Sequence, residues 1–361
     1  MIIKLRKITK SIYKSVINIF FLIFYGKIRL NNKSKAKIFF VKKNKIFSEK
    51  DYKYKIYEFT NSRVYTDCVE NVSVIHNNFL YPESSFQQIN GKLAKPSSNQ
   101  ILKTGTPKYL KKIDGNMLIL AQGASGGNYS HWLLDILPKL KLASLQYNLN
   151  KIDYFYFSKL NSFQLQILKL IGINKNKFID AEKNKHCFSK KIIFISHPNY
   201  FKGTISEAHS NMPKWIIRYL RKKFLKLTKK NKKTYKKIYI DRSDSAFNHC
   251  MLINNHENET FLKSKGFKKL KLSELSFLNQ ITIFNNAKFI VGAHGAGFAN
   301  LIFCKKNTKV LEIKPHNHPG KGYQRISNIN KLNYKLLKLK KIKNHKYGDM
   351  ILKIKELKKY I

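Results

Sequence analysis

The sequence predicts an α/β fold with a parallel β-sheet, and three observations support this prediction. From about residue 128 onward, apolar runs of strand length alternate with segments of helical periodicity. Tyr154–Ser158 and Ile192–Ser196 are largely apolar throughout, as expected for strands buried on both faces of a parallel sheet. Apolar residues make up 43% and aromatic residues 13% of the 361 residues, which is enough for a substantial core. A chain of this length is expected to form two domains.

Residues 1–30 form a basic, apolar N-terminal segment. Its apolar run from Val16 to Tyr25 is about half of the roughly 20 residues that a membrane-spanning helix needs. No small-residue cleavage site follows, which argues against a cleaved signal peptide. Three interpretations stay open: a basic helix at a membrane surface, which we favour, a short signal-anchor, and a buried first helix.

Residues 31–227 are expected to form an N-terminal domain. Its first part carries short strand-like runs between turn-rich segments, and its second part alternates strands with helices. The predicted strands are Lys37–Val41, Tyr52–Phe59, Val72–His76, Met117–Ala121, Tyr154–Ser158 and Ile192–Ser196. The predicted helices begin at about Ser130, span Ser162–Ile171, and run from Pro213, a favoured first-turn residue, to about Leu227.

A run of like charges predicts a solvated linker at residues 228–236. The alternation then restarts, which predicts a C-terminal α/β domain at 237–345 and a C-terminal helix at 346–361. The predicted strands are Lys237–Ile240, Phe267–Leu270, Phe289–Gly292 and Val310–Ile313. The predicted helices are Asn258–Lys265, Leu272–Asn286 with Ser273 as its N-cap, and Gly297–Cys304.

The net charge of +51 comes almost entirely from lysine, because only 7 of the 71 basic residues are arginines. Arginine dominates contacts with bases and phosphates, and no zinc-finger or RNP-like run occurs, so we do not expect a nucleic-acid partner. An anionic membrane surface is a better partner for diffuse lysine. The excess of Lys, Asn and Ile also resembles AT-rich coding bias.

The four cysteines lie far apart without a CxxC pair. This spacing excludes a disulfide scaffold and a thiolate zinc site, and it fits a reducing compartment such as the cytoplasm. The histidines His197, His316 and His318 lack a carboxylate at ligand spacing, so the sequence predicts no metal site.

The first candidate site is the segment from Gly126 to Pro138. His131 and Asp135 are four residues apart, which places them on one face of a helix. Such a pair near a glycine-rich loop can take a proton from a hydroxyl group. The alternative is an intrahelical contact that only satisfies two partly buried groups.

The second candidate site is the GAHGAG segment around His294, where an apolar strand leads into a helix. Small residues let backbone N–H groups approach a ligand, and a helix N-terminus favours an anion. The segment is neither a GxGxxG motif nor a Walker loop, and no GxxxxGK[ST] occurs. The alternative is a tight turn without a ligand.

The third candidate site follows two predicted strands at their carboxyl ends, where open α/β sheets bind ligands. Arg242 is placed to clamp a diphosphate, and Glu312 to accept the hydroxyl groups of a ribose. The alternatives are an ion pair of Arg242 with Asp241 or Asp244, and pairing of Glu312 with a nearby lysine.

These segments occur in an informative order: NYSHWLLDILPKL, YIDRSDS, then FIVGAHGAGFANLIFCKKNTKVLEI. Together they resemble the glycosyltransferase 61 family, over about residues 115–315. This family includes bacterial enzymes of capsular-polysaccharide type and eukaryotic xylosyl- and N-acetylglucosaminyltransferases. The HGAG…N…F…E segment is the most specific part.

The resemblance implies a GT-B architecture, in which two Rossmann-like domains face a cleft. Residues 31–227 would then be the acceptor-side domain and residues 237–345 the nucleotide-sugar-binding domain. It also implies inverting transfer of a hexose or pentose from a nucleotide sugar, generally UDP-linked, without a required metal or other cofactor. The base region maps onto Asp135 and His131. The donor-binding elements map onto Arg242, His294, Gly295, Ala296, Gly297, Asn300 and Glu312.

The mechanism we expect is a single displacement. Asp135, through or with His131, takes the proton of the acceptor hydroxyl, and Arg242 with the backbone around Gly295–Gly297 stabilises the leaving diphosphate. The acceptor is a growing surface glycan, either free or lipid-linked, at the inner face of the cell membrane. One departure from the family is Asn255, which stands where members often have Glu.

Three other classes stay open. One is a non-catalytic protein that binds a glycan or a nucleotide. Another is a lysine-driven binder of anionic lipid or nucleic acid, whose affinity would fall steeply with salt. The third is a GT-B enzyme that uses a different nucleotide.

Overall fold

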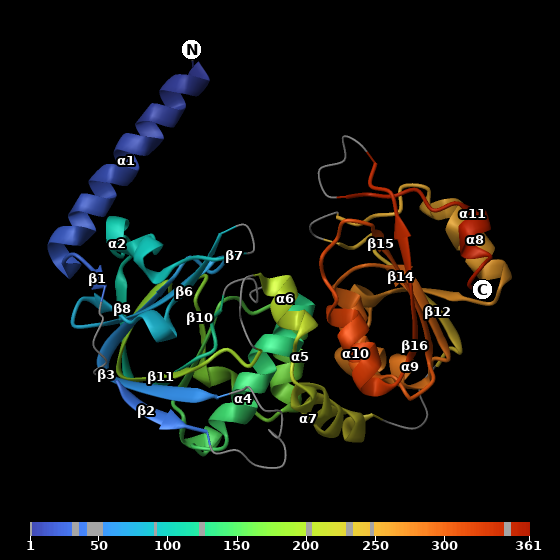
Figure 1. Ribbon diagram of the computed structural model, residues 1–361. Coiled ribbons are helices and arrows are strands. Elements are labelled where there is room, and N and C mark those ends of the chain that lie inside the picture. Colours follow the sequence, from blue (N-terminus) through green and yellow to red (C-terminus); the bar gives the residue numbers. More distant parts are fainter. Residues whose placement is uncertain are drawn as a thin grey trace. The chain divides into compact units, whose positions relative to one another are not determined.

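The structure is a computed structural model that describes residues 2–30, 36–41, 53–89, 92–122, 127–199, 204–228, 234–245, 249–342 and 348–361. The chain divides into two compact units, Met1–Ile205 and Ser206–Ile361. Each unit contains its own β-sheet with helices packed against it (Figure 1). The predicted α/β class is therefore confirmed.

The boundary between the units differs from the predicted linker at 228–236, of which residues 229–233 lie outside the described residues. Helix α7 (Lys214–Phe224) belongs to the second unit. The ring of Phe224 packs on Phe277 and Phe303, and Arg221 donates hydrogen bonds to two backbone carbonyls of the same unit. Periodicity predicts that α7 is amphipathic but not which of the two domains it packs against. Its packing on the second unit therefore places the boundary before α7.

The first unit contains an 11-stranded sheet in the order β1-β5-β4-β3-β11-β8-β9-β10. In addition, β2 pairs with β3, β6 pairs with β4, and β7 pairs with β6. Its strands are β1 (Arg29–Leu30), β2 (Lys37–Phe40), β3 (Lys55–Thr66), β4 (Asn71–His76), β5 (Phe79–Leu80), β6 (Phe86–Ile89), β7 (Lys92–Leu93), β8 (Leu110–Ile119), β9 (Tyr154–Phe157), β10 (Phe178–Asp180) and β11 (His186–Ile195). Its helices are α1 (Ile2–Tyr25), α2 (Ile101–Thr104), α3 (Tyr129–His131), α4 (Leu137–Ala143) and α5 (Ser162–Leu170); α6 (Ile205–Ser210) begins at its last residue.

This sheet is mixed, so the first unit is not a purely parallel Rossmann-like sheet. Strands β11, β8, β9 and β10 are parallel, whereas β2, β3, β4 and β5 pair antiparallel. Asn77 and Asn78 both have positive φ angles of 47° and 60°, as the tight hairpin between β4 and β5 requires. Short connections of this kind leave no room for the crossover helix that parallel pairing needs.

The second unit matches the predicted parallel pattern. Its five strands lie in the order β13-β12-β14-β15-β16 and all pair in parallel. They are β12 (Lys237–Asp241), β13 (Lys268–Lys271), β14 (Phe289–Ala293), β15 (Lys309–Pro315) and β16 (Asn333–Leu339). Its further helices are α8 (Asn255–Ser264), α9 (Phe277–Asn286), the 3₁₀ helix η9 (Ala296–Phe303), α10 (Gly322–Asn330) and α11 (Ile354–Leu357).

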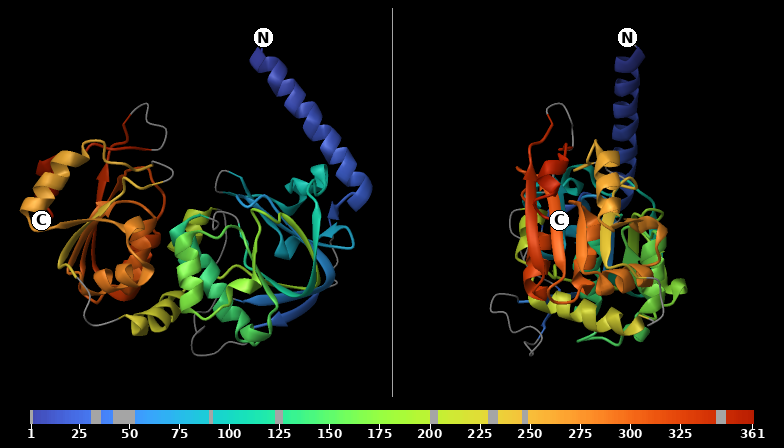
Figure 2. Two further views of the ribbon diagram at one scale, coloured as in Figure 1. Left: turned by 180° about the vertical axis from the view of Figure 1, so that it is seen from behind. Right: turned by 90° about the vertical axis from the view of Figure 1, so that its right-hand side faces the viewer.

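Helices cover both faces of this second sheet (Figure 2). One face packs through Tyr239, Val291 and Leu311 against Leu262 of α8 and Leu357 of α11. On the other face lie α9, η9 and α10, where Phe298 of η9 packs on Tyr323 of α10. Both faces of the sheet are therefore removed from water, which explains the continuous apolar strands.

Two local expectations need correction. The N-cap of α9 is Ser276, whose side chain accepts from the Asn279 N–H, rather than Ser273. The predicted helix at 346–361 is reduced to α11, because Met350 instead pairs with Leu252 beside the sheet. The sequence also gave no sign of β10, α10 or β16.

Helix α1 is exposed along most of its length, which contradicts a buried first helix. The window Ile8–Tyr25 is long and apolar enough to cross a membrane, by length and composition alone, and only 6% of it is buried. Its C-terminal part is docked on the first unit, and its N-terminal part extends away from that unit (Figures 1 and 2).

Candidate functional site

The predicted contact between His131 and Asp135 is present in the first unit. Asn128 caps the start of α3 by accepting from the backbone N–H groups of Ser130 and His131. A π-helical turn, η4 (Trp132–Ile136), follows directly and contains Asp135. His131 Nδ1 lies 2.6 Å from Asp135 Oδ2. The side chain of Asp135 is 3% exposed and that of His131 is 13% exposed, so the imidazole is the more accessible group.

Pro138 explains why this turn is widened and why a third residue joins the pair. Proline has no N–H to donate to the carbonyl of Leu134, four residues earlier, and its ring crowds that carbonyl. In its place, Asn199 Nδ2 donates to the Leu134 carbonyl at 3.1 Å and to Asp135 Oδ1 at 2.6 Å. Both oxygens of Asp135 are thus engaged, which fixes its carboxylate and, through it, the imidazole ring of His131.

This cluster continues along the carboxyl ends of parallel strands. Gln122 follows β8, and His197 and Asn199 follow β11. Gln122 Nε2 lies 2.7 Å from His197 Nε2, and the Gln122 N–H donates to Ser158 Oγ after β9. The position agrees with the rule that ligands bind at this edge of a parallel sheet. Gly123–Gly126 of the predicted glycine-rich loop lie outside the described residues.

Lys139 is a functional candidate that the sequence did not reveal. It lies four residues after Asp135, is fully buried in α4, and places Nζ 5.2 Å from the ring centre of Phe194. Burial lowers the pKa of Lys139 to about 7, and the charge of Asp135 opposes this shift. The i, i+4 spacing from Asp135 beside Pro138 was the available signal, but it was hidden among 64 lysines.

We expect Lys139→Met to raise the free energy of unfolding at pH 7 by about 3–5 kcal/mol. The unfolded chain keeps this lysine protonated up to about pH 10.5, whereas the folded chain releases the proton near pH 7. Because the unfolded state binds more protons in this window, wild-type stability rises with pH there, and the variant loses that rise. Denaturant unfolding at several pH values measures both effects.

The control for this experiment is Lys141→Met on the same helix, because Lys141 is only half-buried. This variant should change neither the free energy of unfolding at pH 7 nor its dependence on pH. An unchanged pH dependence in Lys139→Met would show that the ammonium group is not buried in solution.

The second cluster lies at the carboxyl ends of β12, β14 and β15 in the second unit. His294 follows β14, and its Nδ1 is hydrogen-bonded to Glu312 Oε1 on β15. Tyr334 on β16 donates its hydroxyl to the other carboxylate oxygen, Glu312 Oε2. The glutamate side chain is only 2% exposed. Glu312 therefore holds the ring of His294, and no described hydrogen bond uses the other ring nitrogen of His294, Nε2. The predicted contact of Glu312 with a ribose stays a prediction.

The environment of Glu312 keeps it ionised although it is buried. Burial alone would raise its pKa, but the hydrogen bonds from His294 and Tyr334 and the charge of Lys314 outweigh this effect and lower it. The carboxylate therefore stabilises the fold above its unfolded pKa, and this contribution is lost as the pH falls through the lower folded value.

Arg242 follows β12 and points toward the loop after β14. Its Nη2 donates to Ser245 Oγ at 2.9 Å, whereas its buried Nη1 has no hydrogen-bond partner among the described residues. A Cβ atom at Gly295 would lie 2.0 Å from this Nη1, so the guanidinium needs a glycine there. No ion pair with Asp241 or Asp244 occurs in the described contacts, because Asp241 pairs with Lys269. A buried cation donor without a partner is poised to bind an anion.

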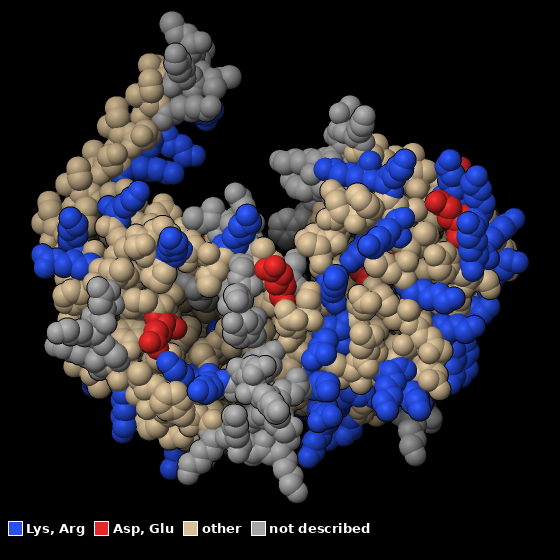
Figure 3. All heavy atoms as spheres, in the orientation of Figure 1, with Lys and Arg blue, Asp and Glu red and all other residues tan. Residues whose placement is uncertain are grey.

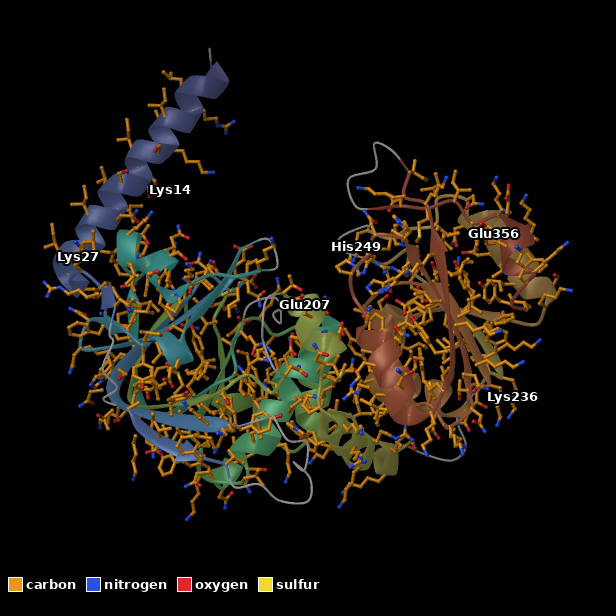
Figure 4. All side chains as sticks on the ribbon, in the orientation of Figure 1. Lys14, Lys27, Glu207, Lys236, His249 and Glu356 are labelled. Carbon is orange, nitrogen blue, oxygen red and sulfur yellow. The ribbon has the colours of Figure 1, made fainter. Side chains whose placement is uncertain are left out.

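Two further histidines, His249 and His318, lie near Arg242 and His294. Figure 4 shows His249 beside the carboxyl ends of the strands of the second unit. Burial lowers the pKa of His249, and the charges of Arg242 and His294 lower it further. Burial, with His294 and Lys314, lowers the pKa of His318 to about 3. The rings of His294 and His318 are 4.0 Å apart. Burial causes the larger part of both shifts, and the part that comes from Arg242, His294 and Lys314 reflects positive charge that a bound phosphate would balance.

The remaining predicted residues have different places. Ala296 and Gly297 form the start of η9 and contribute backbone only. Asn300 is fully buried and donates to Gln280 Oε1 at 2.9 Å and to the Gly297 carbonyl, so it supports the loop from behind. Asn255, the departure from the family pattern, accepts a hydrogen bond from the Tyr239 hydroxyl and donates one to Glu259.

Comparison with known proteins supports the resemblance in the sequence. The model of the glycosyltransferase 61 family matches residues 129–311, a range that contains His131, Asp135, Arg242 and His294 and ends one residue before Glu312. A search of curated proteins finds no match. Among solved structures, a mutant flavo di-iron protein from Thermotoga maritima is 10% identical, with 90% of this chain and 98% of that chain covered.

The TM-score of that likeness is 0.22, which is too low to carry an argument about fold or function. The family match, in contrast, spans just over half of the chain, so the protein belongs to the glycosyltransferase 61 family and is a glycosyltransferase.

Proposed function

We propose that this protein is an inverting glycosyltransferase that transfers a hexose or pentose from a UDP-sugar to a hydroxyl group of a growing surface glycan. The observation that carries the proposal is the buried Nη1 of Arg242, which has no described hydrogen-bond partner and lies at the carboxyl edge of a parallel sheet, against the loop at Gly295. A diphosphate is the anion that this edge binds in related architectures.

In the proposed donor site, Arg242 binds the diphosphate together with His294 Nε2 and the backbone of Gly295, Ala296 and Gly297. Glu312 acts through His294, because it fixes which ring nitrogen faces the ligand. Fixed donors of this kind stabilise a leaving group without reorganisation, and one well-placed donor is worth roughly 3–4 kcal/mol. The proposal therefore includes leaving-group stabilisation without a metal.

In the proposed acceptor site, His131 takes the proton and Asp135 positions it. The support is that Asp135 is almost fully buried with both oxygens engaged, while His131 is more exposed. The acceptor O–H bond breaks as its proton passes to His131, and the oxygen bonds to the anomeric carbon. The bond from that carbon to the diphosphate breaks on the opposite face, so the configuration inverts. A GT-B arrangement, in which the two domains face a cleft, is part of this proposal.

The acceptor and its location complete the proposal. Glycans of the capsule, lipopolysaccharide or exopolysaccharide type carry the hydroxyl groups that this chemistry needs, either free or linked to a lipid. The lysine-rich composition supports work at the inner, anionic face of the cell membrane. Nucleic acid is not proposed as a partner.

A nucleotide panel of UDP, GDP, CDP, CMP and ADP, measured by calorimetry with and without EDTA, tests the donor. We expect UDP to bind selectively, with EDTA changing its affinity less than about twofold, and Glu312→Gln to weaken it by about 3–10-fold because His294 loses its anchor. Tyr334→Phe, which keeps the carboxylate, should weaken it less.

Selective binding of another nucleotide would retain the enzyme class and replace the donor. Loss of UDP binding in EDTA would replace the metal-free site with a metal-dependent one. If no nucleotide bound selectively, the protein would be better described as a non-catalytic binding protein.

A further inference from the structure

Helix α1 carries an aliphatic stripe that nothing in the described structure covers. The stripe consists of Leu5, Ile8, Ile12, Val16, Ile19 and Ile23. Their spacing of three or four residues places all six on one side of the helix. Each is between 51% and 77% exposed, which is unusual for so many aligned aliphatic side chains.

The opposite side of α1 holds the helix on the first unit. Phe21 is 7% exposed and packs edge-on against Tyr109. The Tyr25 hydroxyl accepts from the Leu110 N–H at 3.0 Å, and its ring contacts His186. Two residues correspond to a rotation of about 200° around a helix, so Phe21 and Tyr25 point away from Ile19 and Ile23. Docking of the helix therefore fixes the stripe on the outside.

The charge of this region is of one sign. No Asp or Glu occurs among the first 48 residues, whereas residues 1–30 contain seven Lys and Arg. By the same helical spacing, the exposed side chains of Arg6, Lys10 and Lys14 lie on the side of α1 that faces away from the stripe. Basic side chains gather along one side of the helix in Figure 3. Lys14 and Lys27, which follows the end of the helix, are labelled in Figure 4. An apolar stripe with an opposing basic side is the pattern of helices that lie in the headgroup region of anionic membranes.

We propose that α1 lies flat in the surface of an anionic lipid bilayer, with the aliphatic stripe among the acyl chains and the first unit on the aqueous side. A spanning orientation of Ile8–Tyr25 would need Phe21 and Tyr25 to leave their contacts and would place the ammonium group of Lys14 in hydrocarbon. The in-plane orientation keeps every described contact of α1. This proposal does not depend on the donor, the acceptor or the activity of the enzyme.

Flotation of the full chain with vesicles tests the proposal. Vesicles of phosphatidylcholine with about one third phosphatidylglycerol are compared with pure phosphatidylcholine at fixed salt. The stripe variant Ile12→Asp/Ile19→Asp and the control variant Lys10→Gln/Lys14→Gln both lower the net charge by two, and all four residues are exposed, so both variants should fold. We expect wild type to float with the anionic vesicles, the stripe variant to lose at least tenfold in partitioning, and the control to lose less than threefold.

Four outcomes would overturn the proposal. If the wild type does not float, a lipid bilayer is not the partner of the stripe. Equal losses in the two variants mean that charge alone binds the vesicles. Flotation that resists extraction with alkaline carbonate indicates a spanning helix. The protein could also fail to float and instead self-associate with rising concentration in the absence of vesicles. If the stripe variant abolishes that self-association, the stripe binds a second copy of the chain. In each case nucleotide binding remains a separate measurement.

Discussion

Replacing His131 with glutamine is expected to lower turnover by about 10²–10⁴-fold, the usual contribution of a positioned general base. The affinity for UDP should change by less than about twofold, because Arg242 and His294 lie on a different unit of the chain. The imidazole is the accessible member of the pair, and glutamine has no group that can take a proton at neutral pH. Steady-state kinetics and nucleotide binding on the same preparations give the two values.

The variant Asp135→Asn tests the same assignment through its partner. The carboxylate oxygen at 2.6 Å from His131 Nδ1 becomes an amide group, which no longer selects the ring tautomer that leaves Nε2 as acceptor. We expect a loss of turnover of similar size with folding and UDP binding retained. The control is His256→Gln, an exposed histidine on α8. Turnover near the wild-type value in both site variants would show that the base lies elsewhere.

Arg242→Ala is expected to weaken UDP binding by about 10–100-fold, which is the range for a hydrogen bond to a charged group. Turnover should fall further, because the same guanidinium stabilises charge that grows as the diphosphate leaves. Gly295→Ala should act in the same direction, since its Cβ would take the place of Arg242 Nη1 and displace the guanidinium. Calorimetry with UDP and initial rates separate the two effects.

Arg218→Ala provides the control, because Arg218 is an exposed arginine of the same unit on α7. If Arg242→Ala and Arg218→Ala bound UDP equally well, the buried guanidinium would not be the phosphate ligand, and the donor site would have to be sought outside the Arg242 cluster.

The parts of the site that the sequence predicted are those set by local geometry. Helical spacing brought His131 to Asp135, and the ends of neighbouring parallel strands brought Arg242 close to His294. In contrast, Asn199 meets Asp135 from 64 residues away, across a sheet whose strand order no local pattern encodes. Tyr334 lies on β16, whose sequence NYKLLKL has no strict alternation that would predict a strand.

Burial was the other quantity that the sequence did not supply. Lys139 is one of 64 lysines, and only the packing of α4 on β11 shows that it is enclosed. The mixed sheet of the first unit was missed for a related reason. Short strands with tight turns predict hairpins locally, but whether these hairpins join a parallel sheet depends on β3 pairing with β11, which begins 120 residues after the end of β3.

The docking of α1 has a practical consequence for anyone who shortens the protein to improve its yield. Cutting after Tyr25 would remove the apolar helix but would also uncover the buried His186 and the surface at Gly105 that Leu22 covers. A fragment that begins near Val16 would keep these contacts and discard only the projecting turns. The fragment that begins near Val16 should therefore be recovered in greater amounts than the fragment that begins after Tyr25, although it starts inside a helix.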